Sequence, residues 1–354
     1  MKEQQEVLFT PHISRTLADV LSRYAYDKLF VLTDTNTRRY CMPLFQDCEP
    51  LTQAMPITIP ADDTHKNLES LSSVWMVLSR NGATRKSFLV NLGGGMVTDL
   101  GAFAASTFKR GIAFVNVPTT LLGAVDAAVG GKTGINFNGL KNEIGVFNSA
   151  RSVVIGTEFF HTLSSENLLS GYAEMLKHGL ISDAATYDRL IEMDMLHPDM
   201  QQLLPLLEAS VQVKERVVAE DPFEKGLRKS LNLGHTVGHA FESLSHERNQ
   251  PVMHGYAVAW GLVCELLLSH LQLGFPVERV RQLAAFVRRH YGVFYITCQD
   301  YDRLYERMTH DKKNESSHIN FTLLADVGCV KINCTADKKE IEAMLDLYRD
   351  LFNI

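Results

Sequence analysis

The sequence predicts an α/β N-terminal domain with a mainly parallel sheet, followed by a mostly α-helical C-terminal domain. In the first 160 residues, short runs of β-branched and aromatic residues alternate with helix-like segments. That alternation is typical of a parallel sheet covered on both faces. From about residue 165 the apolar residues follow helical periodicity instead. The chain is long enough for roughly two hydrophobic cores, and we expect domains at residues 1–165 and 166–354.

Each expected element is a short, recognisable run. The expected strands of the N-terminal domain lie within residues 28–39, 87–95, 111–120 and 151–160, with helices at 67–82 and 96–110 between them. The C-terminal domain shows helical periodicity at 203–220, 256–274 and 276–292, and one late pair of strand-like runs at 318–326 and 329–333.

Composition excludes several classes of protein. Apolar residues make up 45% and charged residues 21% of the chain, as in ordinary globular proteins. The net charge of −6 argues against a general nucleic-acid binder. No uninterrupted apolar run approaches the roughly 18 residues of a membrane span, and the N-terminal residues lack a signal core. For that reason we expect no membrane partner. The six cysteines form no Cys-x-x-Cys pair, which indicates reduced thiols in a cytoplasmic protein.

One segment departs from this acidic balance. Residues 91–150 hold three acidic and four basic residues and 11 of the 23 glycines. Such a segment suits an anion-binding pocket, although glycines also mark ordinary turns in α/β proteins. Gly93-Gly94-Gly95 follows an expected strand and precedes an expected helix, where backbone N–H groups can approach a pyrophosphate. The spacing is not the Gly-x-Gly-x-x-Gly fingerprint, and a plain tight turn stays an alternative.

The segment "VPTTLLGAVDAAVGGKTGIN" (117–136) contains hydroxyl groups, a glycine pair and a lysine. Its "GGKT" is similar to the end of a Walker loop. The first glycine of that loop would fall on Asp126, and the strand–loop–helix context is missing. This argues against a nucleoside triphosphatase and leaves Lys132 as a candidate anion-binding lysine.

Two C-terminal segments favour a metal site. His235 and His239 lie one helical turn apart in "LNLGHTVGHAFE", and His254 follows a short polar loop. Glu174 lies among apolar residues, and a buried carboxylate needs a partner or a metal. Glu174, His235 and His254 would form the three-ligand set of a catalytic zinc site. Core packing of the histidines and an ordinary Glu174–Lys177 ion pair stay alternatives, while "HTVGH" lacks the glutamate of a zincin protease.

Five segments in this order resemble the 3-dehydroquinate synthase family, sugar phosphate cyclases of the shikimate pathway. They are "GGGMVTDLGAFAASTFKRGI", "VPTTLLGAVDAAVGGKTGIN", "GYAEMLKHGLI", "GLRKSLNLGHTVGHAFE" and "MHGYAVAWG". The resemblance runs from about Asp34 to the "HDKK" at 310–313. It implies a Rossmann-like sheet in the N-terminal domain, an active site in the cleft between two domains, and a homodimer.

The resemblance also implies the ligands and the residues that hold them. Members of the family bind NAD and one divalent metal, zinc or cobalt, and the metal ligands would be Glu174, His235 and His254. The NAD contacts would be Asp34, Asn36, Asp63, Lys66, Gly94, Gly95, Asp99, Thr119, Thr120, Leu122, Asp126, Lys132, Lys141 and Thr162. The substrate contacts would be Arg110, Lys132, Asn142, Lys177, Lys214, Arg228, Asn232, His239 and Lys312, with Lys313 as the alternative to Lys312.

The reaction implied by the resemblance explains this set. The family converts 3-deoxy-D-arabino-heptulosonate 7-phosphate to 3-dehydroquinate and phosphate by transient oxidation with NAD, phosphate elimination, re-reduction and aldol closure. The substrate is a phosphorylated sugar acid, so the lysines and arginines would supply the opposing charge. His239 would be a proton shuttle acting with Asn232, not a metal ligand.

The sequence departs from the family pattern at several positions. Ala127 and Ala128 replace a serine pair, Asn167 and Tyr256 each replace a glutamate, and Asp62-Asp63 replaces Gly-Glu. These changes bear on the NAD contacts and on the outer shell of the metal. The alternatives are a sister cyclase with another sugar phosphate, a polyol dehydrogenase of the glycerol dehydrogenase type, and a metal-stabilised binding module without turnover.

Overall fold

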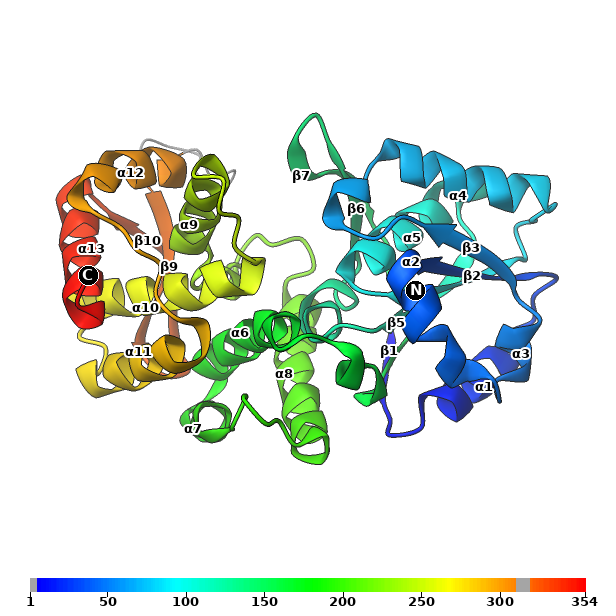
Figure 1. The fold of residues 1–354 in the computed structure, drawn as a ribbon, viewed down its shortest axis with the longest axis horizontal. Helices are drawn as coiled ribbons and strands as arrows, with labels where there is room; N and C mark the ends of the chain where they lie inside the picture. The colour runs from blue at the N-terminus through cyan, green and yellow to red at the C-terminus, as the bar shows by residue number, and fades with distance from the viewer. Residues whose placement is uncertain (1–4, 310–318) are drawn as a thin grey trace. The chain divides into compact units, whose positions relative to one another are not determined.

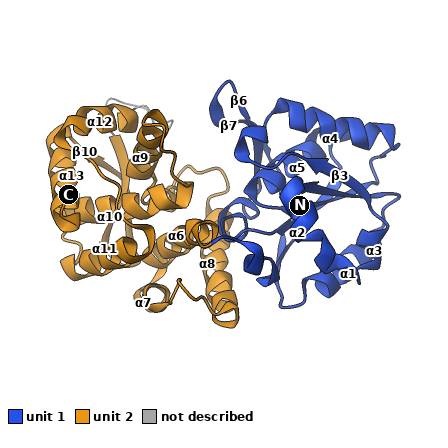
Figure 2. Ribbon diagram, viewed as in Figure 1, with its two compact units in different colours: residues 1–164 blue, residues 165–354 orange. Residues whose placement is uncertain are grey.

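Residues 5–309 and 319–354 are described by a computed structural model of the 354-residue chain (Figure 1). The chain forms two compact units, unit 1 (Met1–Ser164) and unit 2 (Ser165–Ile354), shown in Figure 2. The division falls one residue before the boundary that we expect from the change in sequence periodicity.

Unit 1 is built on a six-stranded sheet in which every described pairing is parallel. The spatial order is β1-β8-β5-β4-β2-β3. The strands are β1 (Glu6–Phe9), β2 (Leu29–Asp34), β3 (Met55–Ile59), β4 (Phe88–Gly93), β5 (Ala113–Pro118) and β8 (Ser152–Ile155). The four expected runs are confirmed as β2, β4, β5 and β8, and the parallel α/β class is confirmed with them.

Helices and a separate hairpin complete unit 1. The helices are α1 (Ile13–Ser22), α2 (Thr35–Tyr40), α3 (Glu49–Thr52), α4 (Leu68–Arg80) and α5 (Gly95–Thr107), and the expected helices at 67–82 and 96–110 correspond to α4 and α5. The hairpin consists of β6 (Lys132–Phe137) and β7 (Leu140–Phe147), which pair antiparallel. The sequence analysis did not predict this hairpin.

The strand order creates a switch point between β2 and β4. From β2 the chain moves outward to β3, and it then returns to place β4 on the other side of β2. In such sheets, ligands bind beyond the carboxyl ends of the two strands at which the order reverses. Here those ends are Asp34 of β2 and Gly93 of β4.

Unit 2 is mostly helical, as expected. Its helices are α6 (Ser165–Ser182), α7 (Ala184–Glu192), α8 (Met200–Glu220), α9 (His235–Glu247), α10 (His254–Leu273), α11 (Val277–Tyr291), α12 (Tyr301–Thr309) and α13 (Lys338–Phe352). The late strand pair is confirmed as β9 (Ile319–Asp326) and β10 (Cys329–Ala336).

The centre of unit 2 is α10, which packs against α6, α9, α11, α13 and β9. Within the described ranges it is the one helix whose length and hydropathy alone would suit a membrane span, although polar residues interrupt its apolar run. Its neighbours bury 72% of that window, which is typical of a core helix.

Two glycines allow the helices around α10 to approach closely. A Cβ atom on Gly261 would lie 2.1 Å from the carbonyl oxygen of Gly234 and 2.7 Å from the amide nitrogen of Gly238 in α9. A Cβ atom on Gly255 would lie 1.9 Å from the carbonyl oxygen of Ser170 in α6. The backbones of α6 and α9 therefore touch α10 where a side chain on α10 would keep them apart.

We expect Gly261→Ala to destabilise the protein by about 3 kcal/mol, because its Cβ atom would have to displace backbone atoms of α9. Chemical denaturation followed by circular dichroism measures this. Gly274→Ala is the matched control at the C-terminal end of α10, where φ is +74° and no atom lies within 4 Å of the added Cβ. It should lose only about 1 kcal/mol for its left-handed backbone. Equal loss in the two variants would contradict the close approach of α9 and α10.

Candidate metal centre and cofactor-binding residues

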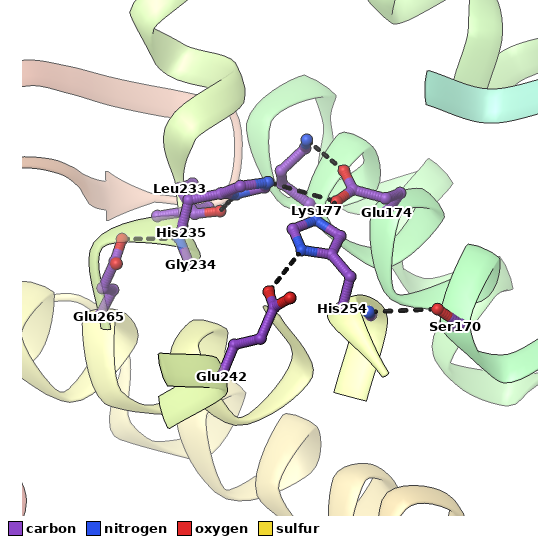
Figure 3. Close-up of polar contacts among 10 residues, drawn as sticks. Ser170, Glu174, Lys177, Leu233, Gly234, His235, Glu242, His254 and Glu265 are labelled. Atoms are coloured by element: carbon purple, nitrogen blue, oxygen red, sulfur yellow. Dashed lines mark hydrogen bonds and ion pairs between the residues drawn. The ribbon is translucent and has the colours of Figure 1, made fainter. Parts of the chain in front are cut away.

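Three side chains from three helices converge in unit 2. Glu174 comes from the middle of α6, His235 is the first residue of α9, and His254 is the first residue of α10. One donor atom of each lies within 4.8 Å of the donor atoms of the other two. No other group of three potential metal ligands occurs among residues 5–309 and 319–354. The structure therefore brings together the three ligands that the sequence predicts (Figure 3).

The two oxygens of the Glu174 carboxylate have different neighbours. Its side chain is fully buried, and Oε2 accepts from the ammonium group of Lys177. Oε1 accepts no hydrogen bond from the described residues, and it lies 3.4 Å from Nε2 of His235 and 3.6 Å from Nε2 of His254. Burial alone would raise the pKa of Glu174, but Lys177 and His235 outweigh burial and hold this pKa well below its usual value. An ionised, buried oxygen facing two imidazole nitrogens fits a divalent cation.

Each imidazole is oriented through its other nitrogen. Nδ1 of His235 lies 3.1 Å from the carbonyl oxygen of Leu233, and Nδ1 of His254 lies 3.1 Å from Oε2 of Glu242. With Nδ1–H donating to these acceptors, Nε2 of both rings faces Glu174. Outer contacts of this kind fix the ring orientation and the tautomer of metal-binding histidines.

The surroundings shift the pKa values of His235 and His254 in opposite directions. Burial lowers the pKa of His235 to about 4, against the attraction of Glu174. Burial also disfavours charge on His254, but Glu174 and the hydrogen-bonded Glu242 outweigh it and raise the pKa of His254 to about 9. At neutral pH the protein without metal therefore has a neutral His235 and a protonated His254 between two carboxylates.

His239 lies beside the ligand set but is not part of it. Its ring centroid is 5.4 Å from that of His235 and 5.8 Å from that of His254. Asn232, at the end of the short 3-10 helix Leu227–Asn232, donates to Oε1 of Glu224 at 3.2 Å. The sequence analysis missed Glu224, because only the fold brings this loop residue to Asn232.

Three predicted anion-binding residues of unit 2, Lys177, Lys214 and Arg228, are buried. The loop before Arg228 is organised by Asp221, whose Oδ2 accepts the backbone N–H groups of Gly226 and Arg228. The guanidinium group of Arg228 donates to the carbonyl oxygen of Pro222 at 2.8 Å. The predicted Lys312 and its alternative Lys313 lie outside the described residues.

Several predicted NAD contacts lie at the carboxyl ends of the strands in unit 1. Asp34 ends β2, and its Oδ1 accepts the N–H groups of Asn36 and Thr37. Gly94 is the N-cap of α5 and Gly95 its first residue. Thr119 and Thr120 directly follow β5. These residues flank the switch point of the sheet.

A second group of predicted residues forms one polar network. The buried ammonium group of Lys66 pairs with Asp99 at 2.5 Å and donates to Oδ1 of Asn142. The backbone N–H of Asn142 donates to Asn136, whose side chain contacts Asp63. The network ties the β6–β7 hairpin to the loop after β3.

The remaining predicted residues of unit 1 are spread more widely. Arg110, Lys132, Lys141 and Thr162 are exposed, and Leu122 and Asp126 lie at the π-helical turn Gly123–Ala127. Whether these residues contact a ligand stays a prediction.

The structure shows where two of the residues that depart from the family pattern lie, Ala127 and Tyr256. Ala127 closes the π-helical turn, and its Cβ atom lies beside Gly95. Tyr256 packs in an aromatic cluster, with ring centroids 5.0 Å from Tyr291 and 5.9 Å from Trp260. Glu242, and not residue 256, contacts Nδ1 of His254. The outer carboxylate of this histidine is therefore present despite the tyrosine.

Comparisons with known proteins find relatives over nearly the whole chain. The family model described as 3-dehydroquinate synthase N-terminal matches residues 56–170, and the corresponding C-terminal model matches residues 171–314. The chain is 52% identical over 351 residues to a 3-dehydroquinate synthase of Parabacteroides distasonis, covering 99% of each chain. It is 35% identical over 343 residues to one of Streptococcus pyogenes serotype M3, covering 96% of this chain and 95% of the relative.

A solved structure shows the same fold. It is a 2-epi-5-epi-valiolone synthase from Streptomyces hygroscopicus with NAD+ and Zn2+ bound, at a TM-score of 0.85 and 24% identity. The match covers 99% of this chain and 98% of that chain.

The charge states of the two histidines predict that metal binding is coupled to proton release. At pH 7.5, Zn2+ binding should release about one proton, because the metal must displace the proton of His254 while His235 is already neutral. The affinity for Zn2+ should rise about tenfold per pH unit between pH 5 and 9. Calorimetric titration in two buffers with different ionisation enthalpies counts the protons.

Glu242→Gln is the matched control for this experiment. It removes a carboxylate that raises the pKa of His254, so fewer protons should be released at the same pH. Release near zero from the unaltered protein would contradict the protonated His254.

Proposed function

The chain belongs to the 3-dehydroquinate synthase family, and we propose that it converts 3-deoxy-D-arabino-heptulosonate 7-phosphate to 3-dehydroquinate and phosphate with NAD and a divalent metal, zinc or cobalt. The observation that carries the proposal is the buried Oε1 of Glu174, which accepts no hydrogen bond from the described residues and faces Nε2 of His235 and of His254. The 52% identity to a 3-dehydroquinate synthase over nearly the whole chain supports the choice of reaction.

Each unit would hold one cofactor. Glu174, His235 and His254 would bind the metal, and the residues around the switch point of unit 1, among them Asp34 and Gly94, would bind NAD. When bound, the metal lowers the proton affinity of a substrate alcohol, and NAD accepts a hydride and returns it.

The side chains around the metal ligands would handle charge and protons. Lys177 keeps Glu174 ionised, and with Lys214 and Arg228 it would supply positive charge for a substrate that carries a carboxylate and a phosphate. His239 is close to both imidazole ligands but outside the ligand set, and it would accept a proton from the substrate and return it.

The alternatives differ in their products. A polyol dehydrogenase would release NADH, a sister cyclase would use another sugar phosphate, and a binding module would bind NAD and metal without turnover. The two matched family models and the full-length identity favour 3-dehydroquinate synthase over all three.

The decisive assay supplies the heptulosonate phosphate, NAD and Zn2+ and follows two signals. We expect stoichiometric release of inorganic phosphate and formation of 3-dehydroquinate, detected with a coupled dehydroquinase, while NADH absorbance does not accumulate. Accumulating NADH would identify a dehydrogenase. Phosphate release from another heptulose or hexose phosphate, and not from this substrate, would identify a sister cyclase.

Two histidine variants separate metal binding from proton transfer. His254→Ala should abolish both metal retention and phosphate release, because it removes a ligand. His239→Ala should retain the metal but slow turnover by roughly 100-fold or more, as expected for loss of a general acid/base. Elemental analysis and phosphate release measure the two effects. Full activity of His254→Ala without bound metal, or unchanged turnover of His239→Ala, would contradict the respective role.

A further inference from the structure

We propose that Glu265 is a positioning residue of the metal centre, which holds His235 in place through the backbone of α9. The inference rests on the proposed metal-binding function. Neither the sequence motifs nor the resemblance to the family singles out this position. Figure 3 shows the Glu265 side chain reaching from α10 to the chain segment that carries His235.

Both oxygens of Glu265 accept backbone N–H groups at the start of α9. Oε2 lies 2.6 Å from the nitrogen of Gly234, and Oε1 lies 3.2 Å from the nitrogen of Val237. The Glu265 side chain is fully buried. Because His235 lies between these two donors in the chain, the carboxylate fixes the backbone on both sides of the metal ligand.

The start of α9 needs an external acceptor. Its N-cap is Gly234, which has no side chain and adopts a left-handed φ of +79°. The first N–H groups of a helix have no partner within the helix, and an N-cap side chain normally accepts one of them. Glu265, which lies on the neighbouring helix α10, accepts these N–H groups instead of an N-cap side chain. Its negative charge is favourable at a helix N-terminus.

Glu265 also couples the two imidazole ligands. It lies on α10, eleven residues after His254, so one helix carries a metal ligand and the group that anchors the other ligand. Gly261, one turn before Glu265, is the point at which α10 contacts the carbonyl oxygen of Gly234. The relative position of His235 and His254 is therefore set by the contact between α10 and the first turn of α9.

Glu265→Gln tests the role with a change of one atom. The amide has a single acceptor oxygen, so its NH2 group would face one of the two N–H donors. The backbone on that side of His235 would then lose its hydrogen bond. Apoprotein prepared with a chelator is titrated with Co2+ in competition with a chromophoric chelator. We expect Co2+ affinity to fall about 10- to 100-fold, as for loss of other outer contacts of metal ligands. The visible Co2+ absorption bands, which report ligand geometry, should also change.

Asp337→Asn is the matched control in the same unit. Asp337 caps α13, where its Oδ1 accepts the N–H of Glu340, and α13 carries no proposed ligand. This variant should lose thermal stability but keep the affinity and spectrum of Co2+. If Glu265→Gln does not fold, Glu265→Asp keeps the charge and is too short to reach both donors, and it should show the same spectral change with a smaller loss of affinity.

The outcomes separate the two proposals. Co2+ affinity and spectrum that are unchanged in the Glu265 variants, or equally weakened in Asp337→Asn, would overturn the role of Glu265. Failure of the unaltered protein to bind Co2+ would overturn the metal centre and this inference together. Phosphate release is measured separately, so a metal-binding protein without turnover would count against the proposed reaction only.

Discussion

The arrangement of unit 2 depends on one buried oxygen, Oε1 of Glu174. It is ionised, it accepts no hydrogen bond from the described residues, and two imidazole nitrogens face it at 3.4 and 3.6 Å. Burying such a charge is costly unless a cation or hydrogen bonds compensate it. Lys177 compensates only the other oxygen. In the protein without metal, a proton on His254 compensates the negative charge on Oε1. A divalent cation bound at the same place would compensate this charge more completely.

Holding three ligands around that oxygen requires close contact between helices. The three ligands come from α6, α9 and α10, and two of them are the first residues of their helices. Glycines at positions 255 and 261 remove the side chains that would separate α10 from its neighbours. Each ligand then has one charged outer contact: Lys177 for Glu174, Glu242 for His254, and Glu265 for the backbone around His235. Since these contacts come from different helices, the geometry of the centre is a property of the whole helical core.

Sequence periodicity predicted the parallel sheet and the helical C-terminal part, because buried strands and amphipathic helices leave strong local patterns. It missed β1 and β3, which lie at the two edges of the sheet and are only partly buried, and the β6–β7 hairpin, to which the sequence analysis assigned no secondary structure. It identified Glu174, His235 and His254 as candidate metal ligands because each lies in a short, recognisable sequence motif. Glu224, Glu242 and Glu265 were missed because each acts on a residue 8 to 31 positions away, and only the fold determines such neighbours.

The tyrosine at position 256 illustrates how the fold limits the effect of a substitution. The family usually places a glutamate here, two residues after a metal ligand, and its loss suggested a weakened outer shell. In the structure the Tyr256 ring packs against Tyr291 and Trp260, while the carboxylate that orients His254 comes from Glu242 on α9. One carboxylate is enough to accept the single Nδ1–H of an imidazole. A second carboxylate beside the same ring would add negative charge that the buried site would have to neutralise, so an aromatic residue at position 256 is compatible with a complete metal centre.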